Sequence, residues 1–247
     1  MHQQDDIEDC HVDLWTREET PLINVRITPF QYLKISQYGS HDHRWGIYSC
    51  IWDGSLGLVE YFRRNIDIPK TSLVIDLGSG TGIVGIAMAR LGYANVILTD
   101  LPEALDLMHK NVVINPGIRV SVEKLIWGDA LPDTIKSSIM SSREILITGA
   151  DIIYRTSLFD PLLDTLDSIW KLKTEDSSIR CILATHSIRS YLTDFYNHAQ
   201  NRGFAKRHVS NVVLPDKASD ELPEISAPLN LNATNLVHIV ELTQILT

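Results

Sequence analysis

The feature that most constrains the fold is an alternation of apolar strands, turns and helices that begins at residue 73. Such alternation is typical of parallel strands joined by right-handed helical crossovers. The predicted strands are Leu73–Leu77, Val96–Thr99, Val120–Leu125, Ile145–Ala150, Cys181–Thr185 and Val237–Leu242, and the predicted helices are Ile83–Leu91, Glu103–Val113, Leu158–Lys171 and Ser190–Arg202. The pattern predicts an α/β fold: a Rossmann-like three-layer sandwich around a mostly parallel seven-stranded sheet with an antiparallel C-terminal strand.

Three segments lie outside this alternation. Apolar residues alternate within Val25–Ser36, which predicts a short hairpin or an arm lying on the domain. A helix is predicted from Asp53, which can cap it, until Pro69. Val209–Leu214, followed by an acidic, proline-rich loop, predicts the antiparallel tail of the sheet.

Length and charge set the broad class of protein. A chain of 247 residues can bury one sizeable core, so we expect an N-terminal extension (1–45) packed on a single domain (46–247). The net charge of -9 disfavours non-specific binding to nucleic acid. No stretch is apolar over the ~18 residues that a membrane-spanning helix needs. We expect a monomer that is cytoplasmic, with the nucleus as the alternative, and that has no membrane or nucleic-acid partner.

Neither the cysteines nor the paired histidines of the sequence indicate a metal site. Three widely spaced cysteines, Cys10, Cys50 and Cys181, indicate neither a disulfide framework nor a clustered zinc site. His41 and His43 lie close together, but no further ligands accompany them, so a solvated loop is the simpler interpretation. We therefore expect no metal.

The segment Val74–Gly82 predicts a ligand site, because an acidic residue ends an apolar strand and alternate glycines then lead into a helix. Two cofactors compete, since Gly80-x-Gly82-x-x-Gly85 also matches the dinucleotide fingerprint. Here, however, Asp76 would lie beside the ligand. A carboxylate repels a pyrophosphate but attracts the ammonium group of a methionine moiety. The position of this acidic residue just before the glycines therefore favours S-adenosylmethionine over NAD.

Two later strand ends add candidate donor-binding residues. Asp100 follows the second strand, where a carboxylate can accept hydrogen bonds from both ribose hydroxyls, and its alternative role is a helix cap. Trp127 and Asp129 follow the third strand and could stack on adenine and bond its amino group. Taken alone, a tryptophan such as Trp127 is more often a packed surface aromatic residue than a ligand-binding one.

These motifs together resemble a known family, the seven-strand protein-lysine methyltransferases of the methyltransferase-like group, family 16. The resemblance spans residues of about 45 to 205 and rests on Trp52-Asp53-Gly54, the Val74–Gly82 motif, Thr99-Asp100-Leu101-Pro102, Asn111, Trp127-Gly128-Asp129 and Asp151-Ile152-Ile153-Tyr154. The glycine motif is shared by many methyltransferases, whereas the Asp-x-x-Tyr motif combined with the Trp-Asp helix start is the part most specific to this family.

The resemblance implies a role for individual residues. The methyl donor would be bound by Asp76, Gly78, Gly80, Asp100 and Trp127, together with Ala150 at the end of the fourth strand, and Trp52 would border its methionine end. Asp151 and Tyr154, the candidate catalytic residues, would line the channel that admits the substrate amine. Their alternative roles are a helix-capping carboxylate and a core aromatic residue.

The implied activity is S-adenosylmethionine-dependent N-methylation that yields S-adenosylhomocysteine. The expected substrate is a lysine on a folded protein, such as an elongation factor or a chaperone. Three alternatives stay open: methylation of a small amine such as nicotinamide, a non-catalytic scaffold that binds the donor, and a nicotinamide-dependent oxidoreductase.

Overall fold

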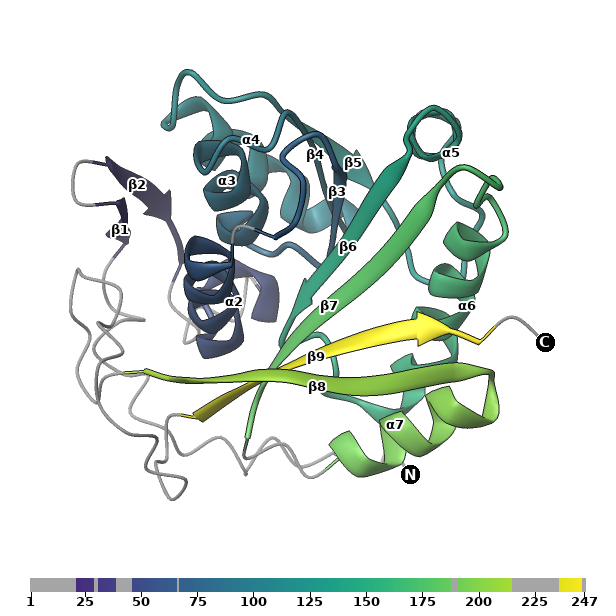
Figure 1. The fold of residues 1–247 in the computed structure, drawn as a ribbon. Helices are drawn as coiled ribbons and strands as arrows, with labels where there is room; N and C mark the ends of the chain where they lie inside the picture. Colours follow the sequence, from purple (N-terminus) through teal and green to yellow (C-terminus); the bar gives the residue numbers. More distant parts are fainter. Residues whose placement is uncertain are drawn as a thin grey trace.

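The computed structural model describes residues 21–28, 31–38, 46–65, 67–187, 191–214 and 236–245. Its centre is a seven-stranded sheet of order β5-β4-β3-β6-β7-β9-β8 (Figure 1). The strands are β3 (Leu73–Leu77), β4 (Asn95–Asp100), β5 (Val120–Lys124), β6 (Glu144–Ala150), β7 (Ser178–His186), β8 (Phe204–Val213) and β9 (Leu236–Gln244). Strands β3 to β7 are parallel, whereas β9 is antiparallel to both of its neighbours. The predicted fold class is confirmed.

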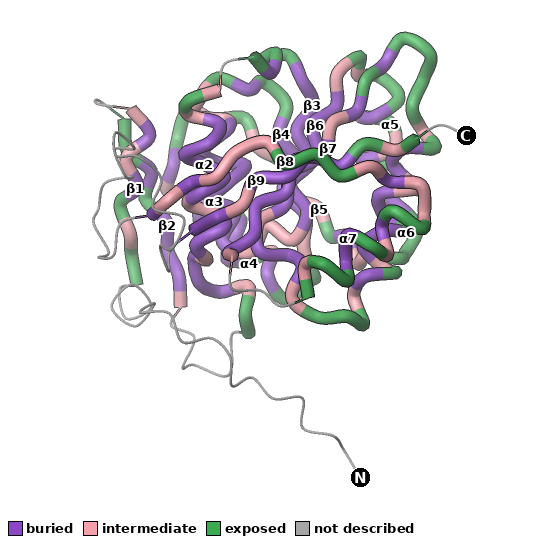
Figure 2. Tube along the Cα trace, turned by 60° about the horizontal axis from the view of Figure 1, so that its bottom comes forward, coloured by how far each residue is buried: buried purple, intermediate pink, exposed green. Residues whose placement is uncertain are grey.

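Helices cover both faces of the sheet. One face carries α2 (Asp53–Arg64), α3 (Ile83–Arg90) and α4 (Leu105–Val113), and the other carries α5 (Asp133–Met140), α6 (Phe159–Trp170) and α7 (Leu192–Asn201). Because both faces are covered, the central strands are mostly apolar, and Leu73–Leu77 is buried along its whole length (Figure 2). Each face therefore has its own hydrophobic core, as a three-layer sandwich requires.

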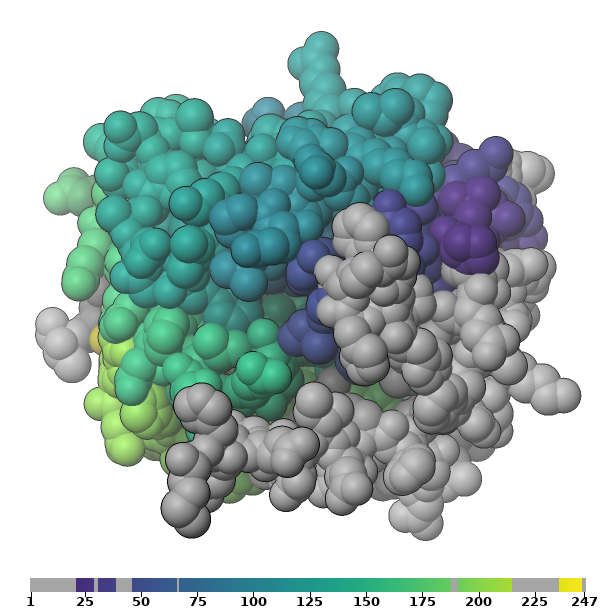
Figure 3. All heavy atoms as spheres, turned by 180° about the vertical axis from the view of Figure 1, so that it is seen from behind, coloured from purple at the N-terminus to yellow at the C-terminus, as the bar shows by residue number. Residues whose placement is uncertain are grey.

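The N-terminal segment forms a two-stranded antiparallel ribbon, β1 (Leu22–Thr28) with β2 (Gln31–Ser36). Its inner side chains, Val25, Ile27, Leu33 and Ile35, are buried in the same core as α2 and α3. In the space-filling view of Figure 3 the purple residues of this ribbon lie against the body of the domain. The hairpin predicted for Val25–Ser36 is confirmed over the described residues, and the boundary at residue 45 stays a prediction.

The structure corrects some local expectations. Helix α5 was not predicted, because its sequence is short and serine-rich and only Ile135 and Ile139 mark a buried face. Strand β8 begins at Phe204 and not at Val209. The prediction missed its first half because the residues there are mostly polar and exposed and give no apolar pattern. Helix α2 ends at Arg64, well before Pro69. The His41–His43 and Pro215–Pro228 segments lie outside the described residues.

Candidate active site

A cavity opens at the carboxyl ends of β3, β4 and β6. Strand order reverses between β3 and β6, and this is where open α/β sheets bind their ligands. All predicted site residues except Asp76 line it: Trp52, Gly78, Gly80, Asp100, Trp127, Ala150, Asp151 and Tyr154. The fold thus brings residues from separate motifs to one cavity, while their individual roles stay predictions.

The glycine loop forms the floor of this cavity. Gly78 and Gly80 both have left-handed backbone conformations, with φ of 61° and 54°. A Cβ atom on Gly78 would lie 3.0 Å from the Trp127 ring, and one on Gly80 would lie 3.0 Å from the Tyr48 carbonyl oxygen. Larger residues at either position would therefore be strained and would also fill the space that the glycines leave.

Asp100 is tied to the glycine loop at the end of β4. Its Oδ2 accepts the Gly80 amide at 2.7 Å, and its Oδ1 accepts the Leu101 amide at 2.7 Å. Burial raises the pKa of this carboxyl, while the two amide bonds lower it. Each oxygen keeps a second lone pair, so Asp100 can still accept hydrogen bonds from a ligand in the cavity.

Asp76 lies beneath the loop instead of lining the cavity. It is buried, and its Oδ1 accepts the Thr148 hydroxyl at 2.6 Å. Its Oδ2 is also buried and has no hydrogen-bond partner among the described residues. Burial raises the pKa of Asp76 to about 6, against the lowering effects of the Thr148 and Ser79 hydroxyls and the Gly85 backbone. An unpartnered buried carboxylate oxygen below a ligand cavity favours a cationic group above it.

Asp151 joins three elements at the edge of the cavity. Its Oδ2 accepts the amide of Gly54 in the first turn of α2 at 2.6 Å, and its Oδ1 accepts the amide of His186 at the end of β7 at 3.0 Å. Its own amide donates to the Ala184 carbonyl at 2.8 Å. The expectation that Asp53 caps α2 was wrong: the N-cap position is Trp52, Asp53 is the first helical residue, and the Gly54 amide donates to Asp151.

Tyr154 and Tyr48 place two phenol groups on the cavity wall. Burial raises the pKa of Tyr154, opposed by the charge of Arg155 and reinforced by Asp100. Burial also raises the pKa of Tyr48, and Glu103 and Asp100 raise it further. Both hydroxyls are therefore protonated at neutral pH. Sequence reasoning missed Tyr48, because its place against Gly80 depends on how the chain before α2 packs on the loop.

The cavity residues fit S-adenosylmethionine better than a dinucleotide. The amides of Ser79, Gly80 and Gly82 donate to Thr99, Asp100 and Ser79 respectively, at 2.7 to 3.0 Å. A pyrophosphate needs free loop amides and would instead meet the Asp100 carboxylate on the cavity wall, with the buried Asp76 carboxylate beneath the loop. A ligand with ribose hydroxyls and a cationic amino-acid end matches the same groups.

Sequence comparison places the chain among known proteins. The lysine methyltransferase family model matches residues 31–202. The chain belongs to the lysine methyltransferase family. This finding confirms the resemblance predicted from the motifs, and the match covers the glycine loop, Asp100 and the Asp151–Tyr154 motif.

Individual members of the lysine methyltransferase family are similar over part of their length. EEF1A lysine methyltransferase 3 of Mus musculus is 41% identical over 138 residues, which are 54% of this chain and 55% of the relative. Protein N-lysine methyltransferase METTL21A of Danio rerio is 35% identical over 130 residues, 51% and 57% of the two chains. Protein-lysine N-methyltransferase EFM3 of Chaetomium thermophilum is 30% identical over 178 residues, which are 70% of this chain and 52% of the relative. The matches span about half the length of each relative.

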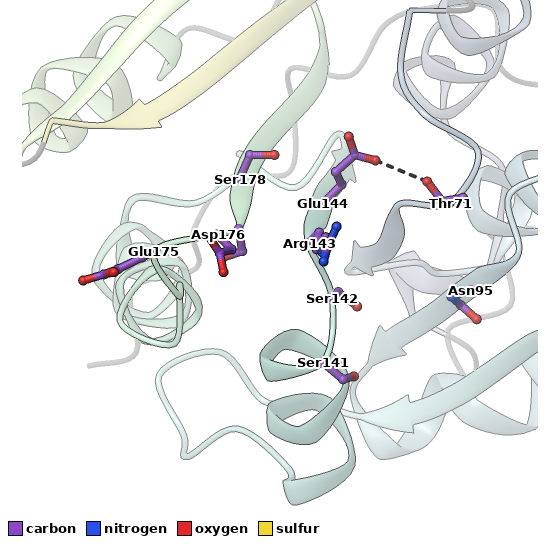
Figure 4. A pocket seen from close by; sticks show the side chains of 10 residues that line it. Thr71, Asn95, Ser141, Ser142, Arg143, Glu144, Glu175, Asp176 and Ser178 are labelled. Atoms are coloured by element: carbon purple, nitrogen blue, oxygen red, sulfur yellow. Dashed lines mark hydrogen bonds between the residues drawn. The ribbon is translucent and has the colours of Figure 1, made fainter.

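A second hollow in this chain lies at the opposite, amino-terminal ends of the strands. Figure 4 shows its polar lining, in which the Thr71 hydroxyl donates to Glu144 at 3.3 Å. The Ser177 hydroxyl there is already bonded within its own turn.

Among the described residues no cluster of histidine, cysteine and acidic side chains could hold a metal ion. Nor is any described helix long and apolar enough to cross a membrane.

Proposed function

We propose that this chain is an S-adenosylmethionine-dependent protein-lysine N-methyltransferase. The observation that carries the proposal is a single cavity that joins the glycine loop and Asp100 to Asp151 and Tyr154. Family membership supports the same activity. The names of the relatives favour a lysine on a protein over a small amine as the methyl acceptor.

Four residues would hold the methyl donor. Asp100 would accept the ribose hydroxyls with its free lone pairs, and Trp127 would pack against the adenine ring. Gly78 leaves room for close approach, and the buried Asp76 carboxylate attracts the cationic amino-acid end. When bound, S-adenosylmethionine supplies a methyl group that its sulfonium charge already activates.

The protein itself must supply an uncharged, well-placed amine. A lysine of pKa ~10.4 is protonated at pH 7, and removing that proton there requires about 4.6 kcal/mol. Burial of the amine in a cavity with aromatic walls reduces this penalty, because desolvation disfavours the ammonium form. Placement of the lysine nitrogen in line with the methyl carbon, at roughly 3 to 3.5 Å, lowers the activation barrier further.

Asp151 and Tyr154 suit positioning better than proton removal. Two backbone amides fix the position of the Asp151 carboxylate at the edge of the cavity, and a carboxylate is a chemically suitable acceptor for a bond from the amine. Tyr154 has a raised pKa, so its neutral hydroxyl offers a lone pair and does not act as a strong base. We assign both residues to orientation of the lysine nitrogen.

The test uses the purified full chain, donor labelled in the methyl group, and a cell lysate. Label in protein bands, followed by mass spectrometry that locates it on a lysine, is the expected result. Label only in small molecules would support an amine N-methyltransferase instead. Donor binding without any transfer, in lysate and with purified basic proteins, would indicate a scaffold and overturn the proposed activity.

A further inference from the structure

Two asparagines, one in the last turn of α4 and one just after this helix, hold the N-terminal β-ribbon on the domain. Asn111 and Asn115 are both buried and lie four residues apart, and Asn115 follows the last helical residue, Val113, by two positions. They face Lys34 and Ser36 of β2, and each amide side chain pairs with one of these residues as a neighbouring strand would.

Asn111 has a second connection that Asn115 lacks. Its Oδ1 accepts the Ser36 amide at 2.7 Å, and its Nδ2 donates to the Ser36 carbonyl at 2.9 Å. The same Nδ2 donates to the carbonyl of Thr81 at 2.8 Å. Thr81 belongs to the glycine loop and lines the cavity. One buried amide therefore bonds the ribbon and the donor-binding loop at once.

Asn115 is the matched control that the chain itself offers. Its Oδ1 accepts the Lys34 amide at 3.0 Å, and its Nδ2 donates to the Lys34 carbonyl at 2.7 Å. Its remaining side-chain bond goes back to the last turn of α4, to the Asn111 carbonyl at 2.7 Å. Asn115 thus docks the ribbon in the same manner without touching the loop.

We propose that Asn111 is a positioning residue through which docking of the β1–β2 ribbon sets the affinity of the cavity for the methyl donor. Loss of its side chain removes the hydrogen bond to the Thr81 carbonyl, so the loop shifts to find another donor. Coupling between two sites is reciprocal, so donor binding must in turn hold the ribbon more firmly on α4. The inference rests on the proposed function, since it takes S-adenosylmethionine as the ligand.

The first experiment compares Asn111→Ala with Asn115→Ala in the full chain, by calorimetric titration with S-adenosylhomocysteine. We expect donor-site affinity to fall about tenfold or more in Asn111→Ala, which is about 1.4 kcal/mol, and by less than about threefold in Asn115→Ala. In steady-state kinetics the donor KM should rise in Asn111→Ala while the KM for the protein substrate stays unchanged. Equal losses in the two variants would overturn the inference.

The second experiment needs no variant and decides the matter if Asn111→Ala fails to fold. Hydrogen exchange of the Lys34 and Ser36 amides is followed in the wild-type chain with and without saturating S-adenosylhomocysteine. We expect slower exchange with ligand, because the loop and the ribbon share Asn111. Unchanged exchange despite measured binding refutes the coupling, whereas no binding to the wild-type chain refutes the proposed function instead.

Discussion

At the scale of single residues, Asp76 combines deep burial with an incomplete set of hydrogen bonds. One of its oxygens is bonded to Thr148, and the other has no partner among the described residues. Burial raises its pKa to about 6, from an ordinary value of ~3.9 in an unfolded chain. A group whose pKa is raised on folding stabilises the protein fully below its unfolded pKa, and this contribution is lost as pH rises through the folded pKa.

The first prediction is a pH-dependent stability difference between the wild-type chain and Asp76→Asn. Asparagine keeps the shape and can still accept the Thr148 hydroxyl, but it does not titrate. Between about pH 4 and pH 7 the wild-type free energy of unfolding should fall relative to that of the variant, by on the order of 3 kcal/mol. Urea denaturation at constant ionic strength measures it. A difference that is the same at every pH would show that Asp76 does not titrate in this range.

At the scale of elements, the first turn of α2 is fitted against the end of β6. The Asp151 carboxylate takes the place of a local cap for this helix, and Asp151 itself adopts a left-handed conformation with φ of 52°. A Cβ atom on Gly54 would lie 2.5 Å from Asp151 Oδ2. Helix and carboxylate can therefore keep this contact only while residue 54 is glycine.

The second prediction follows for Gly54→Ala, with Gly57→Ala as its control on the same helix. A Cβ on Gly57 would clash with Val237 of β9 at 2.6 Å, which disturbs packing but does not touch Asp151. Both variants should have a lower melting temperature. Only Gly54→Ala should lower kcat by about a hundredfold where both are folded, because a shift of about 1 Å in a positioning group has that effect. Similar kcat losses in both variants would assign the effect to general destabilisation.

At the scale of the whole molecule, the cavity proposed to bind the donor lies where strand order reverses between β3 and β6, and its lining residues come from both sides of that point. A ligand bound there contacts the ends of β3, β4 and β6 together with the segment before α2. Because these elements separate on unfolding, such a ligand binds the folded chain and not the unfolded one. Donor binding and global stability are therefore linked.

The third prediction is a ligand-dependent melting temperature. At a concentration about 100 times its Kd, a ligand adds about 2.7 kcal/mol to the free energy of unfolding. With roughly 2 cal/mol/K of unfolding entropy per residue, 247 residues convert this to a rise of about 5 °C. Thermal melts with S-adenosylhomocysteine should show this rise, and melts with NAD should not. A rise with NAD alone would reassign the cavity to a dinucleotide.

Much of the fold and of the donor site follows from local sequence patterns. The alternation from residue 73 onward predicts the parallel sheet, because apolar strands of this length can be buried only between covering helices. The glycines and Asp100 could be assigned to the cavity because backbone freedom and acceptor chemistry are properties of the residue type at a strand end. Helix α5 escaped prediction, since a single pair of isoleucines is too weak a periodic signal.

The sequence by itself determined the fold class, the positions of most strands and helices, and the family. Only the tertiary structure decided that Asp151 holds the start of α2, that Asp76 lies beneath the cavity, and that Asn111 joins the ribbon to the glycine loop. The reason is the separation of the partners along the chain: the Asp151–Gly54 bond spans 97 residues and the Asn111–Ser36 bond 75. A local pattern reports which groups a segment offers, but packing of the whole chain selects the partners that those groups meet.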